Sequence, residues 1–189
     1  MRKFIIIGSL VMMLCLNGAG CAEKNDEASY ISFVNDPNNK ITQQIEMGGV
    51  TVTMKWLPLT YRRLMFSGSQ QEKDSLVKED GLYYFDVKLE KIQGDKPAKE
   101  KIMYLNFDMQ QDFALAGSKD SIAPVFCQKI ENGIGGSYEY MLAFESPVNA
   151  EEDFTVFYHD KIFGLGTVAF VYKQEDIRKI PILKSKDPE

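Results

Sequence analysis

The sequence predicts an all-β fold, an antiparallel β-sandwich of about seven or eight short strands with one or two short helices. Two observations predict this class. Apolar and polar side chains alternate with a period of two in several segments, which is typical of half-buried strands. Clusters of Gly, Pro, Asn and Asp separate these segments, where a chain must turn between strands. The sequence therefore favours two packed sheets over a helical bundle.

The expected elements follow from this alternation. In the strand over 82–92, Phe85 and Val87 point to one face, and Tyr84 and Lys88 point to the other. Short helices are expected over 59–66 and 175–179, and a first short strand is expected over 30–34. The segment over 108–115 is ambiguous, and one interpretation is a short helix capped by Asp108. The remaining strands are expected over 50–56, 103–107, 123–130, 137–144, 154–158 and 166–172. The connection over 93–99 predicts a hairpin between the strands over 82–92 and 103–107.

The first twenty residues are not expected to belong to the fold. Arg2 and Lys3 precede an apolar run over 4–16, which is broken only by Gly8 and Ser9. A membrane-spanning helix needs about 20 apolar residues, so this shorter run is typical of a secretory signal. Small and turn-forming residues follow over 17–20, and the next residue is Cys21.

The ending of this segment resembles the lipobox of bacterial lipoproteins. The resemblance rests on Ala19, Gly20 and Cys21, while Gly18 stands where the lipobox usually has Leu. It implies that Cys21 is diacylated on sulfur and becomes the mature N-terminus. The acidic stretch over 23–27 resembles the export signal of Bacteroidota lipoproteins, which implies the outer membrane and its outer face. The alternative is an ordinary cleaved signal in which Cys21 is incidental.

We therefore expect three parts: a signal peptide over 1–20, a polar tether with a first strand over 21–44, and a single sandwich domain over 45–189. Loss of the signal removes Arg2 and Lys3, which changes the net charge from −5 to −7. Such a charge argues against a nucleic-acid partner, and attachment to the membrane must come from the acyl chains. Cys127 is then the only other cysteine, and its apolar neighbours predict a core residue.

The search for catalytic and metal-binding residues favours no site, so neither a catalytic residue, a metal nor a cofactor is expected. His159 follows a predicted strand and is interpreted as a loop residue rather than a general base. The string over 164–169 matches the dinucleotide pattern G-x-G-x-x-A, but a strand rather than a helix should follow it. Asp108 and Asp112 are expected to share the face of a short helix, and the oxygen-rich turn over 35–39 lacks the spacing of a calcium loop.

Aromatic residues give the one candidate binding surface. Tyr84 and Tyr104 alternate with polar neighbours, so both are expected on the outer face of a sheet. Exposed aromatic rings can stack on sugars or anchor a protein partner. The alternative is cross-strand pairing that only stabilises the sheet.

Three classes of function remain open. The first is a non-enzymatic lipoprotein of the cell envelope, an accessory or assembly component of a surface complex that contacts the membrane through its lipid and contacts other envelope proteins. The second is a glycan- or peptide-binding surface lipoprotein. The third is a hydrolase that depends on a pair of carboxylates, because histidine and cysteine are nearly absent.

Overall fold

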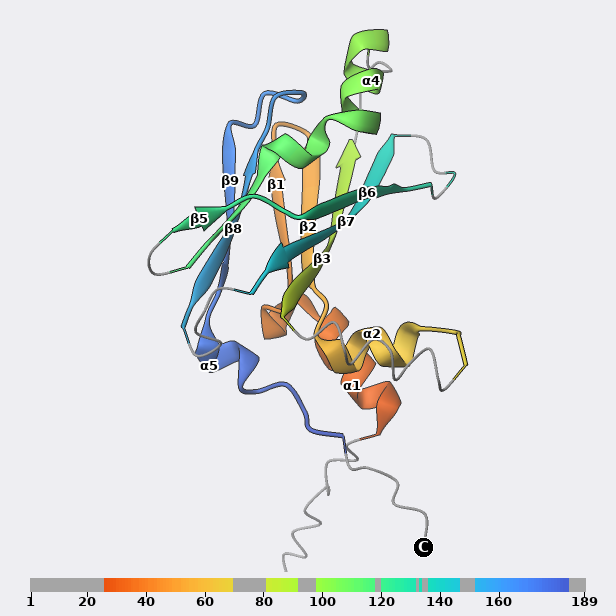
Figure 1. Ribbon diagram of the computed structural model, residues 1–189, viewed down its shortest axis with the longest axis vertical. Coiled ribbons are helices and arrows are strands. Elements are labelled where there is room, and N and C mark those ends of the chain that lie inside the picture. The colour runs from red at the N-terminus through yellow and green to blue at the C-terminus, as the bar shows by residue number, and fades with distance from the viewer. Residues whose placement is uncertain are drawn as a thin grey trace, which may run out of the picture.

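The computed structural model describes residues 26–69, 81–91, 98–117, 120–131, 133, 136–146 and 152–183. Over these residues the chain forms nine strands in two antiparallel sheets, which confirms the mainly β fold (Figure 1). The elements in chain order are α1 (Glu27–Asn35), η1 (Pro37–Asn39), β1 (Thr42–Met47), β2 (Val50–Trp56), α2 (Leu59–Met65), β3 (Leu82–Lys91), α4 (Lys99–Phe107), η3 (Met109–Asp112), β4 (Phe113–Ala116), β5 (Ser121–Ile122), β6 (Phe126–Ile130), β7 (Ser137–Glu145), β8 (Phe154–His159), β9 (Thr167–Tyr172) and α5 (Gln174–Ile177).

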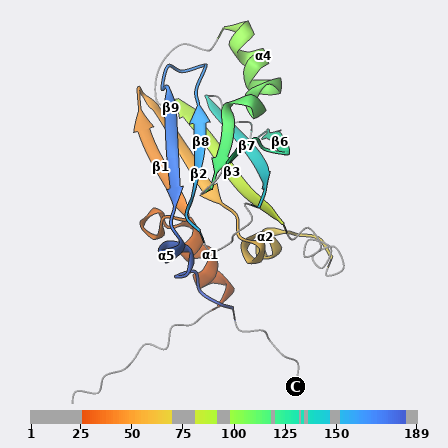
Figure 2. The same ribbon diagram turned by 60° about the vertical axis from the view of Figure 1, so that its left-hand side comes forward.

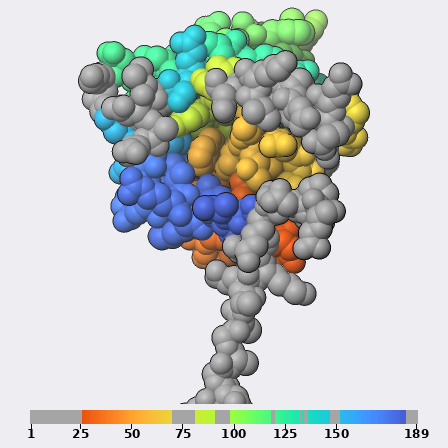
Figure 3. Space-filling view, turned by 60° about the horizontal axis from the view of Figure 1, so that its bottom comes forward, coloured from red at the N-terminus to blue at the C-terminus, as the bar shows by residue number. Residues whose placement is uncertain are grey.

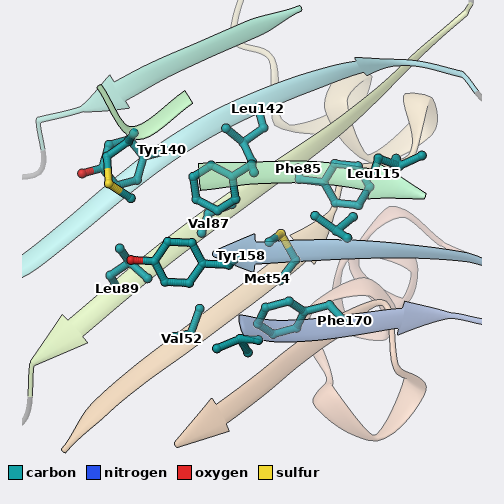
Figure 4. Packing of buried hydrophobic residues seen from close by; sticks show 14 of the residues in the cluster. Val52, Met54, Phe85, Val87, Leu89, Leu115, Tyr140, Leu142, Tyr158 and Phe170 are labelled. Atoms are coloured by element: carbon teal, nitrogen blue, oxygen red, sulfur yellow. The ribbon is translucent and has the colours of Figure 1, made fainter. Parts of the chain in front are cut away.

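The larger sheet has five strands in the order β1-β2-β3-β7-β6, and the smaller sheet has four strands in the order β5-β4-β8-β9. Period-two alternation puts Phe85, Val87 and Leu89 of β3 on the inner face, where all three are fully buried. Figure 4 shows these side chains meeting those of the smaller sheet, among them Tyr158 and Phe170. This main core fills the space between the sheets.

Two hydrogen bonds link the sheets along their β1 and β9 sides. The hydroxyl of Tyr172 donates to the carbonyl oxygen of Met54 at 3.1 Å. The side-chain amide of Gln43 donates to the carbonyl oxygen of Val171 at 2.8 Å. The two sheets are therefore linked at one side of the sandwich, and β5 and β6 are the edge strands at the other side.

The strand expected over 30–34 is wrong, because these residues belong to helix α1. Asp26 caps the helix by accepting a hydrogen bond from the Ser29 amide at 2.8 Å. Tyr30 and Val34 lie four residues apart, so one helix face buries both of them. They form a second core together with three residues of the following segments, Ile41, Leu57 and Tyr61. Packed structure thus begins at α1, within the segment expected to be a tether.

The strand expected over 103–107 is also wrong, and so is its hairpin with β3. Residues 99–107 form helix α4, and β3 pairs with β2 and β7 instead. Met103, Leu105 and Phe107 alternate with polar residues, but Leu105 alone of these three is buried. Lys, Glu, Met and Leu are strong helix formers, and this local preference prevails over the short alternation.

The other expected elements are confirmed with small shifts in their ends. They comprise α2, the strands β2, β3, β6, β7, β8 and β9, and the short helix α5. The helix considered over 108–115 is confirmed only as the 3-10 turn η3, after which Phe113 begins β4. Cys21 and the remainder of the signal segment lie outside the described residues.

Candidate functional site

Tyr84 lies on the outer face of the larger sheet, as expected from alternation. Its strand neighbour on β7 is Ala143, and its ring packs against the second core. The guanidinium of Arg62, from α2, lies over the ring at 4.0 Å from the ring centre. Helix α2 therefore covers part of the surface that Tyr84 was expected to expose.

Tyr104 does not lie on a strand. It is on α4, which lies near the end of β3, whereas Tyr84 lies near the beginning of β3 (Figure 1). Its ring packs against the main core, and its hydroxyl donates to Asp112 Oδ1 at 2.6 Å. The structure therefore does not bring Tyr84 and Tyr104 together on one face of a sheet.

The hydroxyl of Tyr104 belongs to a polar network around a buried carboxylate. Asp112 is fully buried, and its Oδ1 also lies 2.8 Å from the ammonium nitrogen of Lys161. Lys161 in turn donates to the Tyr104 hydroxyl at 3.0 Å. We call these three residues the Asp112 network, and they join α4, η3 and the connection between β8 and β9.

The electrostatics of this network follow from burial and from the Asp112 charge. Burial raises the pKa of Tyr104, and the nearby Asp112 raises it further. The ammonium of Lys161 has a raised pKa because Asp112 and Tyr104 accept hydrogen bonds from it, which favours its charged form. Cys127, on the inner face of β6, has a pKa raised to about 11 by burial and then by Asp112. The thiol therefore stays protonated at neutral pH. Cys127 is half-buried and packs against the main core rather than within it.

The Oδ2 atom of Asp112 is buried and has no hydrogen-bond partner among the described residues. Within these residues, no group of three or more His, Cys, Asp or Glu side chains is arranged to hold a metal ion. The sequence pairs Asp112 with Asp108, but only Asp112 of the two is buried. The spacing of the residues does not reveal this burial. The network links three segments across the end of the main core.

A second carboxylate organises the connection between β8 and β9. Asp160 Oδ2 accepts a hydrogen bond from the Leu165 amide at 2.8 Å. Its Oδ1 accepts hydrogen bonds from the Tyr158 hydroxyl at 2.7 Å and from the Ile162 amide at 3.0 Å. Burial by itself would raise the pKa of Asp160, but these hydrogen bonds and that of Phe163 outweigh burial and lower it. The carboxylate thus fixes the loop that carries Lys161.

The glycines of the dinucleotide-like string end this loop. Gly164 and Gly166 have φ angles of +82° and +72°, and strand β9 follows directly. Only glycine adopts such angles readily. The interpretation of the string as a turn before a strand is confirmed.

The outer face of the smaller sheet is a surface that the sequence analysis did not single out. In Figure 2, β8 and β9 face the viewer and no labelled helix lies over them. None of the outward side chains of β4, β8 and β9 is Asp, Glu, Lys or Arg. We call this surface the uncharged face, and its residues are Ala114, Ala116, Thr155, Phe157, His159, Thr167, Ala169 and Val171.

Two aromatic rings lie on the uncharged face. Phe157 and His159 have ring centres 6.0 Å apart and planes inclined by only 14°. Ala114 and Ala169 flank Phe157 on the neighbouring strands. His159 is exposed at the end of β8, and its Nδ1 lies 3.0 Å from the Thr167 hydroxyl. The alternation of β8 and β9 was the signal that could have revealed this face.

Comparison with known proteins gives limited similarity. No protein-family model matches the chain, and no curated protein matches it. The chain is similar in structure to a novel protein of unknown function from Burkholderia pseudomallei K96243, with a TM-score of 0.41 and 8% identity over 82% of this chain and 86% of that one. It is also similar to a DUF4426 family protein from Pseudomonas aeruginosa PAO1, with a TM-score of 0.37 and 12% identity over 70% of this chain and 92% of that one. No helix among the described residues is long and apolar enough to cross a membrane.

Proposed function

We propose that this chain is a non-enzymatic lipoprotein of the cell envelope, anchored in the outer membrane through Cys21, and an accessory or assembly component of a surface complex. The observation that carries the proposal is the position of Cys21. It follows an apolar run of signal length and precedes the cap of the first helix, Asp26, by five positions. A lipid on Cys21 would therefore be joined almost directly to the packed domain.

The roles of two carboxylates, buried Asp112 and half-buried Asp160, support a binding or assembly function. Asp112 holds Tyr104 and Lys161, and Asp160 holds the amides of its own loop. Each of these charges stabilises the connection between segments of the sandwich. A rigid end of this kind suits a component that presents a fixed surface to a partner.

The anchor is tested by growth with radiolabelled palmitate, with Cys127→Ser as the matched control. We expect label in the wild type and in the Cys127→Ser protein, and none in the Cys21→Ser protein. The Cys21→Ser protein should also leave the membrane fraction. Incorporation into Cys21→Ser would contradict the proposal. Protease treatment of intact cells then tests exposure at the outer face, and capture of envelope proteins by the acylated chain tests the assembly role.

The uncharged face favours a second candidate function, the binding of neutral glycans. Sugar rings stack on aromatic rings, and the hydroxyls of Thr155 and Thr167 could bond to sugar hydroxyls beside Phe157 and His159. A panel of neutral oligosaccharides tests this by calorimetry. We expect Phe157→Ala to abolish binding and Phe66→Ala, which removes an exposed ring of α2's C-terminal cap, to leave it unchanged. No binding by the wild type, or equal binding by both variants, would rule this function out.

A further inference from the structure

The short link between Cys21 and the packed domain limits how the domain sits at a membrane. Five residue steps separate Cys21 from Asp26, and a fully extended chain of this length reaches about 17 Å. Strand β3, with ten residues, is about 33 Å long. A lipid on Cys21 would therefore hold the beginning of α1 near the bilayer surface, closer than the length of the sandwich.

The end of the molecule that carries the beginning of α1 also carries the last described residues. Helix α1, helix α5 and the segment over 180–183 lie together at this end in Figures 1 and 2. Ile180 and Leu183 pack against the second core, which contains Tyr30 and Val34 of α1. In Figure 3, which views the molecule from this end, α1, α2 and the C-terminal segment are all visible. We call it the anchor end.

The anchor end exposes a large apolar side chain. Ile182 is 84% exposed, although the residues on both sides of it are partly buried. Such a side chain gains free energy when it leaves water for the boundary between lipid headgroups and acyl chains.

Charges at the anchor end are mixed rather than basic. Arg178 and Lys179 are exposed, but Lys179 pairs with Asp176 at 2.7 Å, and Asp26 and Glu27 are exposed nearby on α1. Contact with a bilayer at this end would therefore depend on apolar burial and little on anionic lipid.

From these observations we infer that the anchor end docks on the lipid bilayer, with Ile182 inserted at the headgroup boundary. This inference rests on the proposed anchoring through Cys21 and adds an orientation to it. Helix α4, with exposed Met103 and Phe107, then points away from the membrane (Figure 2).

The test uses the full acylated chain in phosphatidylcholine vesicles that contain brominated lipid, which quenches a fluorophore on contact. Cys127 is replaced by Ala, and a fluorophore is attached through Arg178→Cys at the anchor end or Lys99→Cys on α4. We expect the fluorophore at position 178 to lose most of its emission and that at position 99 to retain it. Ile182→Asp should restore emission at position 178, whereas the matched change Met103→Asp should not.

The outcomes separate the orientation from the anchor. A chain that stays in the supernatant overturns both the anchor and the docking. A vesicle-bound chain with equal quenching at both positions, or with quenching that survives Ile182→Asp, overturns the docking alone. Quenching that appears only after phosphatidylglycerol is added would show charge attraction and would overturn the insertion of Ile182.

Discussion

At the residue scale, the buried carboxylate of Asp112 and the half-buried carboxylate of Asp86 differ in what surrounds them. Asp112 Oδ1 has close contacts with Tyr104 and Lys161, at 2.6 Å and 2.8 Å. Asp86, on the outer face of β3, lies 3.9 Å from the Lys55 ammonium, and its Oδ1 is buried without a hydrogen-bond partner among the described residues. Asp112 thus has a close hydrogen bond and a close ion pair at one oxygen, whereas the only ion pair described for Asp86 is a long one.

We predict that Asp112→Asn lowers the free energy of unfolding by about 1 kcal/mol, because the Asn oxygen can still accept from Tyr104 while Lys161 reaches solvent. Lys161→Met should lower it more, because a buried carboxylate then loses its counter-ion. Urea denaturation measures both. A smaller effect for Lys161→Met than for Asp112→Asn would contradict this account of the network.

The change Asp86→Asn should act in the opposite direction. Burial, followed by the nearby Glu139, raises the pKa of Asp86, so folding disfavours its charged form. We predict that Asp86→Asn raises the free energy of unfolding by about 1 kcal/mol at neutral pH, which is the size of a common stabilising substitution. The gain should shrink as the pH falls and Asp86 takes up a proton in the folded state. A loss of stability at neutral pH would show that the Asp86 charge is favourable.

At the element scale, the sequence predicted the long alternating strands and missed helices α1 and α4. In β7 the inward positions include Tyr140, Leu142 and Phe144, and burial of one sheet face is sufficient to produce such a pattern. Helix α1 has only Tyr30 and Val34 fully buried, so its apolar residues could also be interpreted as a strand. The Asp112 network was beyond sequence reasoning because its members come from three segments that only the fold brings together.

The loop between β8 and β9 provides the element-scale prediction. The Asp160 carboxylate has a lowered pKa in the folded chain. Its hydrogen bonds therefore stabilise the fold fully above about pH 4, the usual pKa of an unfolded Asp. This contribution to stability is lost as the pH falls through the pKa of the folded chain. We predict that Asp160→Asn lowers the free energy of unfolding by about 1–2 kcal/mol at pH 7. The difference in the free energy of unfolding between the variant and the wild type should become smaller as the solution is made acidic. A difference that stays constant down to pH 2 would contradict a role for the charge.

At the scale of the whole molecule, the sandwich and its helical end share side chains. Trp56 packs against both the main core and the second core, and its ring lies 6.0 Å from that of Phe154 in the smaller sheet. Phe85 has ring contacts with Tyr172 and Phe154 of the smaller sheet and with Phe144 of its own sheet. Such shared contacts should make the two sheets and the anchor end unfold together.

We therefore predict one cooperative transition that a single core substitution shifts as a whole. Phe85→Ala should lower the free energy of unfolding by about 3–5 kcal/mol, because it leaves a cavity between the sheets, and Phe85→Leu gives a milder change if the first variant does not fold. Phe107→Ala, at a position 73% exposed, is the matched control and should change stability by less than about 0.5 kcal/mol. Fluorescence of Trp56 reports the junction of the two cores and far-UV circular dichroism reports the strands, so coincident curves are expected in every variant. If fluorescence changed at lower denaturant than dichroism, the anchor end would unfold separately from the sandwich.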